Sequence, residues 1–156
     1  MKIGIISDTH DNLVKIDAAV EVFNRERVNL VLHCGDYIAP FSLRRFERLI
    51  SPLKGVFGNC DGEREGLLKV AGELGFLIRD EPWLIEIGEK RVLLSHKPGF
   101  SKENIDFIIY GHTHRTEIGK GFPTLINPGE ASGWLTGKAT IVILDVEKRE
   151  PRVLEI

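Results

Sequence analysis

Two histidines separated by one threonine, His112 and His114, follow an apolar run that ends at Tyr110 and Gly111. Imidazole nitrogens bind divalent transition metals. Alternate residues on an extended segment can direct two such rings toward neighbouring positions. The chain contains only five histidines, so a pair just past a predicted buried strand indicates a metal site.

Four other apolar segments are also followed by side chains that can bind metal. Residues 2–7 are followed by "DTH", 28–34 by "GD", 53–57 by "GNCD" and 91–95 by a single histidine. In open α/β sheets, ligands bind beyond the carboxyl ends of the strands, so we expect these side chains to converge. The candidate metal ligands are Asp8, His10, Asp36, Asn59, His96, His112 and His114. All are oxygen or nitrogen donors, and no thiolate is needed.

Each motif has an ordinary structural interpretation when it stands alone. An Asp-x-His after a strand is usually a turn with a helix cap nearby. Gly-Asp is common, and Gly-Asn favours a tight turn because both residues tolerate positive φ. The combination of all five motifs, each at a predicted strand end, is what favours a metal centre.

The elements expected to position these donors alternate between strand and helix in the first half of the chain. Leu13, Ile16, Val20 and Phe23 recur at helical spacing and predict a helix that begins at Asp11 or Asn12 and ends near Arg27. Further helices are predicted over 40–50 and, after the third strand, up to about residue 74. The second half is predicted to form short strands over 76–78, 83–87, 91–95, 106–110, 123–127 and 139–146.

This pattern predicts an α/β fold of the four-layer α+β sandwich type. Two packed mixed β-sheets are expected, flanked by α-helices, with the metal site at the C-terminal strand ends. At 156 residues, we expect one domain over 1–156.

Composition limits the partners and the location. The net charge of −2 gives no basic face for a nucleic-acid polymer. No apolar run approaches membrane-spanning length and no signal peptide is recognisable, so we expect a cytoplasmic protein with no membrane partner. Cys34 and Cys60 form no CxxC pattern, which argues against a zinc knuckle or a disulfide framework. An oligomer is possible, and its size is left open.

The order of the motifs resembles the calcineurin-like metallophosphoesterase superfamily, and in particular its small bacterial and archaeal phosphodiesterases. That family's pattern is D-x-H, G-D, G-N-[HC]-[DE], a single His and G-H-x-H, and it matches over residues 8–114. "INPGE" at 126–130 is similar to a loop of the small members. The resemblance implies that Asp8, His10 and His114 hold one metal, that Asn59, His96 and His112 hold the other, and that Asp36 bridges them.

The resemblance also implies a reaction and its cofactors. Two divalent ions per chain are expected, Mn²⁺ first, with Ni²⁺, Co²⁺, Fe or Zn²⁺ also admissible for nitrogen and oxygen ligands. The expected activity is hydrolysis of a small phosphodiester by a hydroxide that the two metals generate. We expect Asp36, Asn59 and Cys60 to be catalytic, and Asn59 and Lys97 to contact the substrate.

Three residues depart from the family pattern. Cys60 stands where many relatives have a histidine thought to protonate the leaving group. A neutral thiol is a poor general acid, which favours good leaving groups; the alternative is that Cys60 is a small apolar filler. Lys97 follows His96 directly and is either a phosphate contact or a solvated lysine. Glu130 replaces the usual serine and is expected to alter a loop without touching metal.

The fifth histidine, His33, matches no motif position and is left outside the ligand set. Because it is close in sequence to Asp36, a role in supporting the metal ligands is possible.

Three alternative functions share this fold or these motifs. A phosphomonoesterase would use the same ligands, so the motifs do not separate it from a phosphodiesterase. A non-catalytic scaffold similar to a retromer subunit lacks a full ligand set, whereas all seven positions are filled here. Larger nuclease relatives carry extra domains and basic surfaces that this chain lacks. The identity of the substrate is not readable from the loops.

Overall fold

The computed structural model describes residues 1–99 and 103–156. The helices of this part are α1 (Leu13–Glu26), α2 (Pro40–Arg44), the 3₁₀ helix η1 (Arg45–Arg48) and α3 (Arg64–Leu74). The strands are β1 (Lys2–Ile6), β2 (Leu30–His33), β3 (Leu53–Val56), β4 (Leu77–Arg79), β5 (Trp83–Ile87), β6 (Lys90–Leu94), β7 (Phe107–Ile109), β8 (Thr116–Ile118), β9 (Thr124–Pro128), β10 (Thr140–Asp145) and β11 (Glu150–Glu155).

The strands form two mixed sheets. The first has the order β11-β10-β1-β2-β3-β4 and the second the order β5-β6-β7-β9-β8. β1, β2, β3 and β4 run parallel to one another, as do β6, β7 and β9. The carboxyl ends of β1, β2 and β3 therefore meet at one edge of the first sheet, and those of β6 and β7 meet at one edge of the second.

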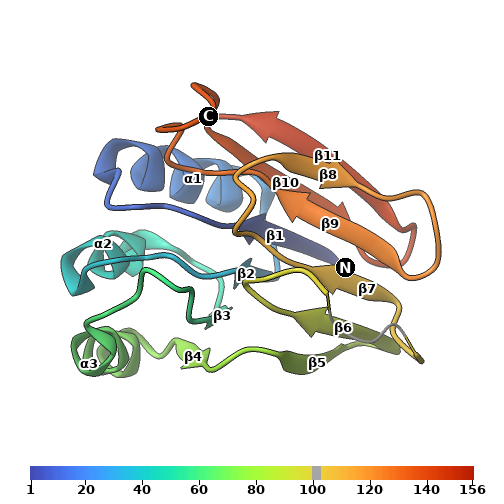
Figure 1. The fold of residues 1–156 in the computed structure, drawn as a ribbon, viewed down its shortest axis with the longest axis horizontal. Helices are drawn as coiled ribbons and strands as arrows, with labels where there is room; N and C mark the ends of the chain where they lie inside the picture. The colour runs from blue at the N-terminus through green and yellow to red at the C-terminus, as the bar shows by residue number, and fades with distance from the viewer. Residues whose placement is uncertain (100–102) are drawn as a thin grey trace.

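The sheets pack against each other, and the helices cover the first sheet. Figure 1 shows α1, α2 and α3 one below another on the left of the view, with the strands to their right. Successive side chains of a strand point to opposite faces, so β1 serves two cores. Ile6 packs under the helices, whereas Ile3 and Ile5 lie in the core between the sheets. The predicted fold class is confirmed.

The outer face of the second sheet carries a small apolar cluster in place of helices in the described part of the chain. Leu93, Ile105, Ile108 and Tyr110 form a small apolar cluster there. The helices of the described residues all pack on the first sheet, so three of the four expected layers are seen in this part of the chain. Over the same residues, no helix combines the length and the apolar character needed to cross a membrane.

The helix predicted over 40–50 is shorter than expected. Its α-helical part ends at Arg44 and continues as the 3₁₀ helix to Arg48. The side chain of Asn24, on α1, donates to the carbonyl of Arg48 at 2.8 Å and accepts from the N–H of Ile50 at 3.0 Å. These two bonds satisfy the backbone where the helix ends.

Two strands were missed by the sequence analysis. β8 and β11 are edge strands with mostly exposed side chains, and β11 contains Pro151. An edge strand with little burial lacks the alternation of apolar and polar residues by which strands are recognised.

Candidate metal centre

The loops after β1, β2, β3, β6 and β7 bring the predicted ligands together. Asp36, after β2, lies at the middle of the group. Its Oδ2 atom is 3.5 Å from Nε2 of His10 and 3.5 Å from Nε2 of His96. His10 comes from the first sheet and His96 from the second, so the group spans the junction between the sheets.

On one side of Asp36 lie Asp8, His10 and His114. Oδ1 of Asp8 is 3.6 Å from Nε2 of His114 and 3.9 Å from Nε2 of His10. The two imidazole rings are stacked with centroids 5.1 Å apart. Oδ1 of Asp8 and Nε2 of His10 are buried and have no hydrogen-bond partner. Buried polar atoms are rarely left without a partner, so these two fit a cation held between the three side chains.

On the other side lie Asn59, His96 and His112. Nε2 of His96 is 2.8 Å from Oδ1 of Asn59 and 3.2 Å from Nδ1 of His112. Nδ1 of His96 is 2.8 Å from the carbonyl oxygen of Cys34. A carbonyl only accepts, so Nδ1 must carry the proton, and in a neutral ring Nε2 then presents a lone pair to the amide oxygen of Asn59. Two acceptors facing each other at this distance fit a shared cation.

The centre is closed at its base and open on one side. Asp8, Asp36 and His96 are buried, whereas Asn59 and His112 are exposed. Burial raises the pKa of Asp8, while the neighbouring Ser7 hydroxyl and the nearby His96 and His114 act in the opposite direction. A cation would favour the ionised carboxylate, and a ligand could reach it from the side of Asn59 and His112.

Backbone strain is concentrated in the ligands. Five of the seven have positive φ: Asp8 at 52°, His10 at 38°, Asp36 at 61°, His112 at 66° and His114 at 60°. Such conformations are uncommon for residues other than glycine and persist where the surrounding structure holds them in place. The fold therefore sets the positions of these side chains before any ligand binds.

Asp61 fixes the loop that presents Asp36. Its buried carboxylate accepts hydrogen bonds from the backbone N–H of Gly58 at 2.7 Å, Ile38 at 2.8 Å and Asp36 at 3.0 Å. Oδ1 of Asp36 in turn accepts from the N–H of Cys60 at 2.9 Å, which leaves Oδ2 for the centre. A Cβ atom at Gly58 would stand 2.1 Å from Oδ1 of Asp36, so only glycine fits there. Asp61 is the last residue of "GNCD", and its supporting role is not predicted by that motif.

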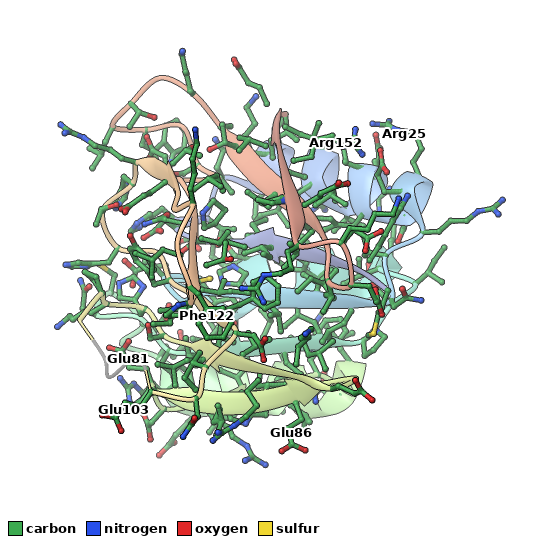
Figure 2. All side chains as sticks on the ribbon, turned by 90° about the vertical axis from the view of Figure 1, so that its right-hand side faces the viewer. Arg25, Glu81, Glu86, Glu103, Phe122 and Arg152 are labelled. Carbon is green, nitrogen blue, oxygen red and sulfur yellow. The ribbon has the colours of Figure 1, made fainter. Side chains whose placement is uncertain are left out.

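Glu81 supports His96 from a separate loop. Its carboxylate accepts from the backbone N–H groups of His96 and Lys97, the latter at 2.8 Å. Figure 2 labels Glu81 on the left of the view. No sequence motif links Glu81 to His96, because the two are fifteen residues apart and meet only through the fold.

Glu130 lies closer to the centre than expected. It was expected in a loop without metal contact, and its buried carboxylate lies 3.1 Å from Nδ1 of His114, one of the predicted ligands. Burial raises the pKa of Glu130, but hydrogen bonds from Thr136, His114 and Ser132 outweigh this effect and lower it to about 2. The signal available in the sequence was a carboxylate where related loops have serine.

Cys60 and Lys97 both lie at the surface. Cys60 is exposed, which contradicts its interpretation as an apolar filler. Its Sγ accepts from Nδ2 of Asn59 at 3.2 Å and lies within 4.8 Å of ligand atoms of His10 and Asp36. Partial desolvation by neighbouring atoms, together with the negative charge of Asp36, raises the pKa of Cys60 to about 11. Lys97 is exposed, and the hydrogen bonds assigned to it among the described residues are all made by its backbone: its N–H donates to Glu81 and its carbonyl accepts from Oγ of Ser95, each at 2.8 Å.

His33 contacts the loops that carry Asp8, His10 and Asp36 rather than joining the group of predicted ligands. It is fully buried and stacks on Tyr37 with ring centroids 3.8 Å apart. Its Nδ1 accepts from the N–H of Gly35 at 3.1 Å, and its Nε2 is 3.3 Å from Oγ1 of Thr9. Burial lowers the pKa of His33 well below its usual value, so it supports two ligand-bearing loops as a neutral ring.

Known proteins resemble this chain over nearly its full length. The chain is 41% identical to a curated phosphodiesterase of the archaeon Methanocaldococcus jannaschii, over 97% of both chains. A solved structure described as a novel archaeal phosphodiesterase superposes with a TM-score of 0.92 at 39% identity, covering all of both chains. The E. coli phosphoesterase YfcE superposes with a TM-score of 0.73 at 22% identity, also over the full length of both.

More distant structures share the fold alone. Vps29 of Entamoeba histolytica superposes with a TM-score of 0.69 at 19% identity, covering 100% of this chain and 99% of that one. The family model of the calcineurin-like phosphoesterase superfamily domain matches residues 1–149, which confirms the family expected from the motifs. The chain therefore belongs to the calcineurin-like phosphoesterase superfamily.

Proposed function

We propose that this protein is a metal-dependent phosphodiesterase whose centre holds two divalent cations. Asp8, His10 and His114 would hold one cation, Asn59, His96 and His112 the other, and Asp36 would be shared. The single observation that carries the proposal is the position of Oδ2 of Asp36, at 3.5 Å from both His10 and His96. One carboxylate oxygen between two groups of donors is the arrangement that a dinuclear centre needs.

The charge of the donor set suits an anionic substrate. Asp8 and Asp36 are the two carboxylates among the seven donors, and the others are imidazoles and an amide. Two divalent cations would thus leave an excess of positive charge in the centre, which attracts a phosphodiester anion. When bound, such cations supply Lewis acidity toward the phosphate and lower the pKa of a water molecule toward neutrality.

The chain's own residues would orient the substrate from the open side of the centre. We propose that Asn59 contacts the phosphate there, because its side chain is both exposed and in contact with His96. Lys97, the exposed residue that follows His96, is proposed as a second phosphate contact. Cys60, with a pKa raised to about 11, stays a neutral thiol near neutral pH and is a weak proton donor. Esters with good leaving groups, such as aryl esters, should therefore react best.

Similarity to a curated phosphodiesterase favours a diester substrate, and the donor atoms of the centre are compatible with several metals. The relative that is 41% identical is named a phosphodiesterase, and the chain covers nearly all of its length. Nitrogen and oxygen donors accept Mn²⁺, Ni²⁺, Co²⁺, Fe and Zn²⁺, and we propose Mn²⁺ as the first choice. The proposed substrate is a small phosphodiester.

A metal-reconstitution assay tests the proposal. Protein stripped with a chelator is assayed with bis(p-nitrophenyl) phosphate and with p-nitrophenyl phosphate, before and after addition of each divalent metal. We expect turnover of the diester only with added metal, and slower turnover of the monoester. A faster monoester reaction would instead assign a phosphomonoesterase. Absence of turnover with every metal and both esters would favour a scaffold.

A further inference from the structure

We propose that Glu130 is a positioning residue for His114. It fixes the imidazole tautomer that can bind metal and so raises the metal affinity of one of the two predicted positions. The inference deepens the proposed function because it concerns the same centre. It rests on metal binding alone, so it does not depend on which ester is hydrolysed or on whether one is hydrolysed at all.

The contact between Glu130 and His114 selects one tautomer of the imidazole ring. An ionised carboxylate only accepts hydrogen bonds, so Nδ1 of His114, 3.1 Å from Oε2 of Glu130, must be the protonated nitrogen. Nε2 then carries the lone pair, and it faces Oδ1 of Asp8 at 3.6 Å. This is the orientation in which His114 can serve as a metal ligand together with Asp8.

Glu130 remains an anion in a buried position because its oxygens have several donors. Oε1 accepts from the hydroxyl of Thr136 at 2.7 Å and from the N–H of Leu135 at 2.9 Å, while Oε2 accepts from the hydroxyl of Ser132 at 2.8 Å. A buried carboxylate is stable when it is satisfied in this way. The charge next to His114 is thus a fixed feature of the fold.

The two halves of the centre differ in this respect. In the other half, Nδ1 of His96 donates to the neutral backbone carbonyl of Cys34 at 2.8 Å. Both rings are held in the tautomer that leaves Nε2 free, but only His114 has a carboxylate behind it. A carboxylate makes the imidazole a more basic ligand than a carbonyl does. Glu130 should therefore contribute to the affinity of the position formed by Asp8, His10 and His114, and much less to the other position.

A purely structural role is the competing explanation, and the chain offers controls for it. Glu130 also ties down residues 132–136, where Nε1 of Trp134 donates to the carbonyl of His10 at 3.0 Å. Ser132→Ala and Thr136→Val each remove one hydroxyl donor to the same carboxylate and leave its contact with His114 in place. If Glu130 acted only through this loop, these variants would weaken metal binding as Glu130→Gln does.

The test is long-range ¹H–¹⁵N NMR of the imidazole rings, first on metal-free protein and then during titration with diamagnetic Zn²⁺. Each ring reports its own metal position, so the two affinities are measured separately. We expect the proton of His114 on Nδ1 in the unaltered protein. Glu130→Gln should lower Zn²⁺ affinity at His10 and His114 by about 10–100-fold relative to that at His96 and His112. Ser132→Ala and Thr136→Val should leave this ratio unchanged.

Three results would overturn the proposal. They are a proton on Nε2 of His114 in the unaltered protein, an unchanged affinity ratio in Glu130→Gln, and an equal loss in the two loop variants. If Glu130→Gln does not fold, two measurements still decide. One is the tautomer of His114 in the unaltered protein. The other is the ratio of the two Zn²⁺ affinities in Glu130→Asp, which keeps the charge and should retain most of the affinity. A protein with the expected Zn²⁺ pattern and no phosphoesterase activity would support Glu130 and reject the proposed function.

Discussion

The side-chain amide oxygen of Asn59 lies 2.8 Å from Nε2 of His96, although Asn59 follows a strand of the first sheet and His96 a strand of the second. The predicted metal ligands thus meet across the junction of the two sheets. A cation bound there would hold the sheets together in a way that the unfolded chain cannot reproduce. Metal binding and folding should therefore be coupled.

This coupling predicts that divalent metal raises the thermal stability of the protein. A ligand that binds only the folded state at about 100 times its Kd adds about 2.7 kcal/mol to the free energy of unfolding. We expect Tm to rise with Mn²⁺ concentration and to return to its metal-free value when a chelator is added. Asn59→Ala, which removes the donor from one sheet only, should reduce the rise. An equal rise in this variant would contradict a role of Asn59 in binding metal.

Asp36→Asn should cost the centre at least one of its metals. The substitution removes a negative charge that lies between two groups of donors, 3.5 Å from each of two imidazole nitrogens. Metal analysis should show two equivalents in the unaltered protein and no more than one in the variant, with activity reduced by orders of magnitude. Asp17→Asn is the matched control, because Asp17 pairs with Arg45 and Arg48 on the surface. Two equivalents in Asp36→Asn would rule out a shared carboxylate.

The convergence of the metal ligands was predictable from the sequence, whereas the carboxylates that hold these ligands in place were not. Parallel strands end at one edge of a sheet, so polar motifs after β1, β2 and β3 had to lie near one another. Glu81, Asp61 and Glu130 act on these ligands from loops whose paths depend on tertiary packing. Their sequence neighbourhoods contain no signal for the specific partner of each carboxylate.

The same distinction explains what was missed in the fold. Buried strands such as β1 and β10 are apolar runs that the sequence shows directly. The edge strand β11 has no such run and is recognisable only by its pairing with β10. The end of η1, which completes the helix predicted over 40–50, depends on Asn24, and Asn24 lies in α1.

Asp61→Asn should destabilise the fold and loosen Asp36. The buried carboxylate accepts three backbone N–H bonds, and an amide offers one acceptor oxygen and a donor that would face N–H groups. A loss of about 1–3 kcal/mol is expected from groups left unsatisfied. Urea unfolding of metal-free protein measures it. Asp80→Asn, at an exposed ion pair with Arg64, should change stability by less than about 1 kcal/mol. Similar losses in both variants would reject the role of Asp61.

Asp106 should make stability depend on pH in the acid range. Its pKa is lowered by the backbone N–H of Arg91 and by the charges of Lys90 and Arg149. Because the pKa of Asp106 is lower in the folded protein than in the unfolded chain, Asp106 stabilises the fold at pH values above its unfolded pKa of about 3.9. This stabilisation is lost as the pH falls through the lower pKa of the folded state. The difference in unfolding free energy between the unaltered protein and Asp106→Asn should be present at pH 6 and vanish in strong acid. A difference independent of pH would contradict this assignment.

The last prediction separates the holding of metal from proton transfer, and it concerns Cys60. The thiol is exposed beside Asn59, and its raised pKa of about 11 makes it a poor general acid near neutral pH. Cys60→Ala should keep the full metal content, because Cys60 is not among the proposed ligands. Cys60→His would introduce an imidazole that can donate a proton at neutral pH.

If proton donation to the leaving group is what the centre lacks, this histidine should accelerate diesters with alkyl leaving groups more than nitrophenyl diesters. General acid catalysis typically contributes about 10²–10⁴-fold, so a partly aligned ring would still be visible in kcat/KM. Rates for a matched pair of diesters that differ only in the leaving group provide the measurement, with Cys60→Ala as the reference. Equal changes for both leaving groups would show that Cys60 does not occupy the position of a proton donor, and loss of metal in Cys60→Ala would identify the thiol as a ligand.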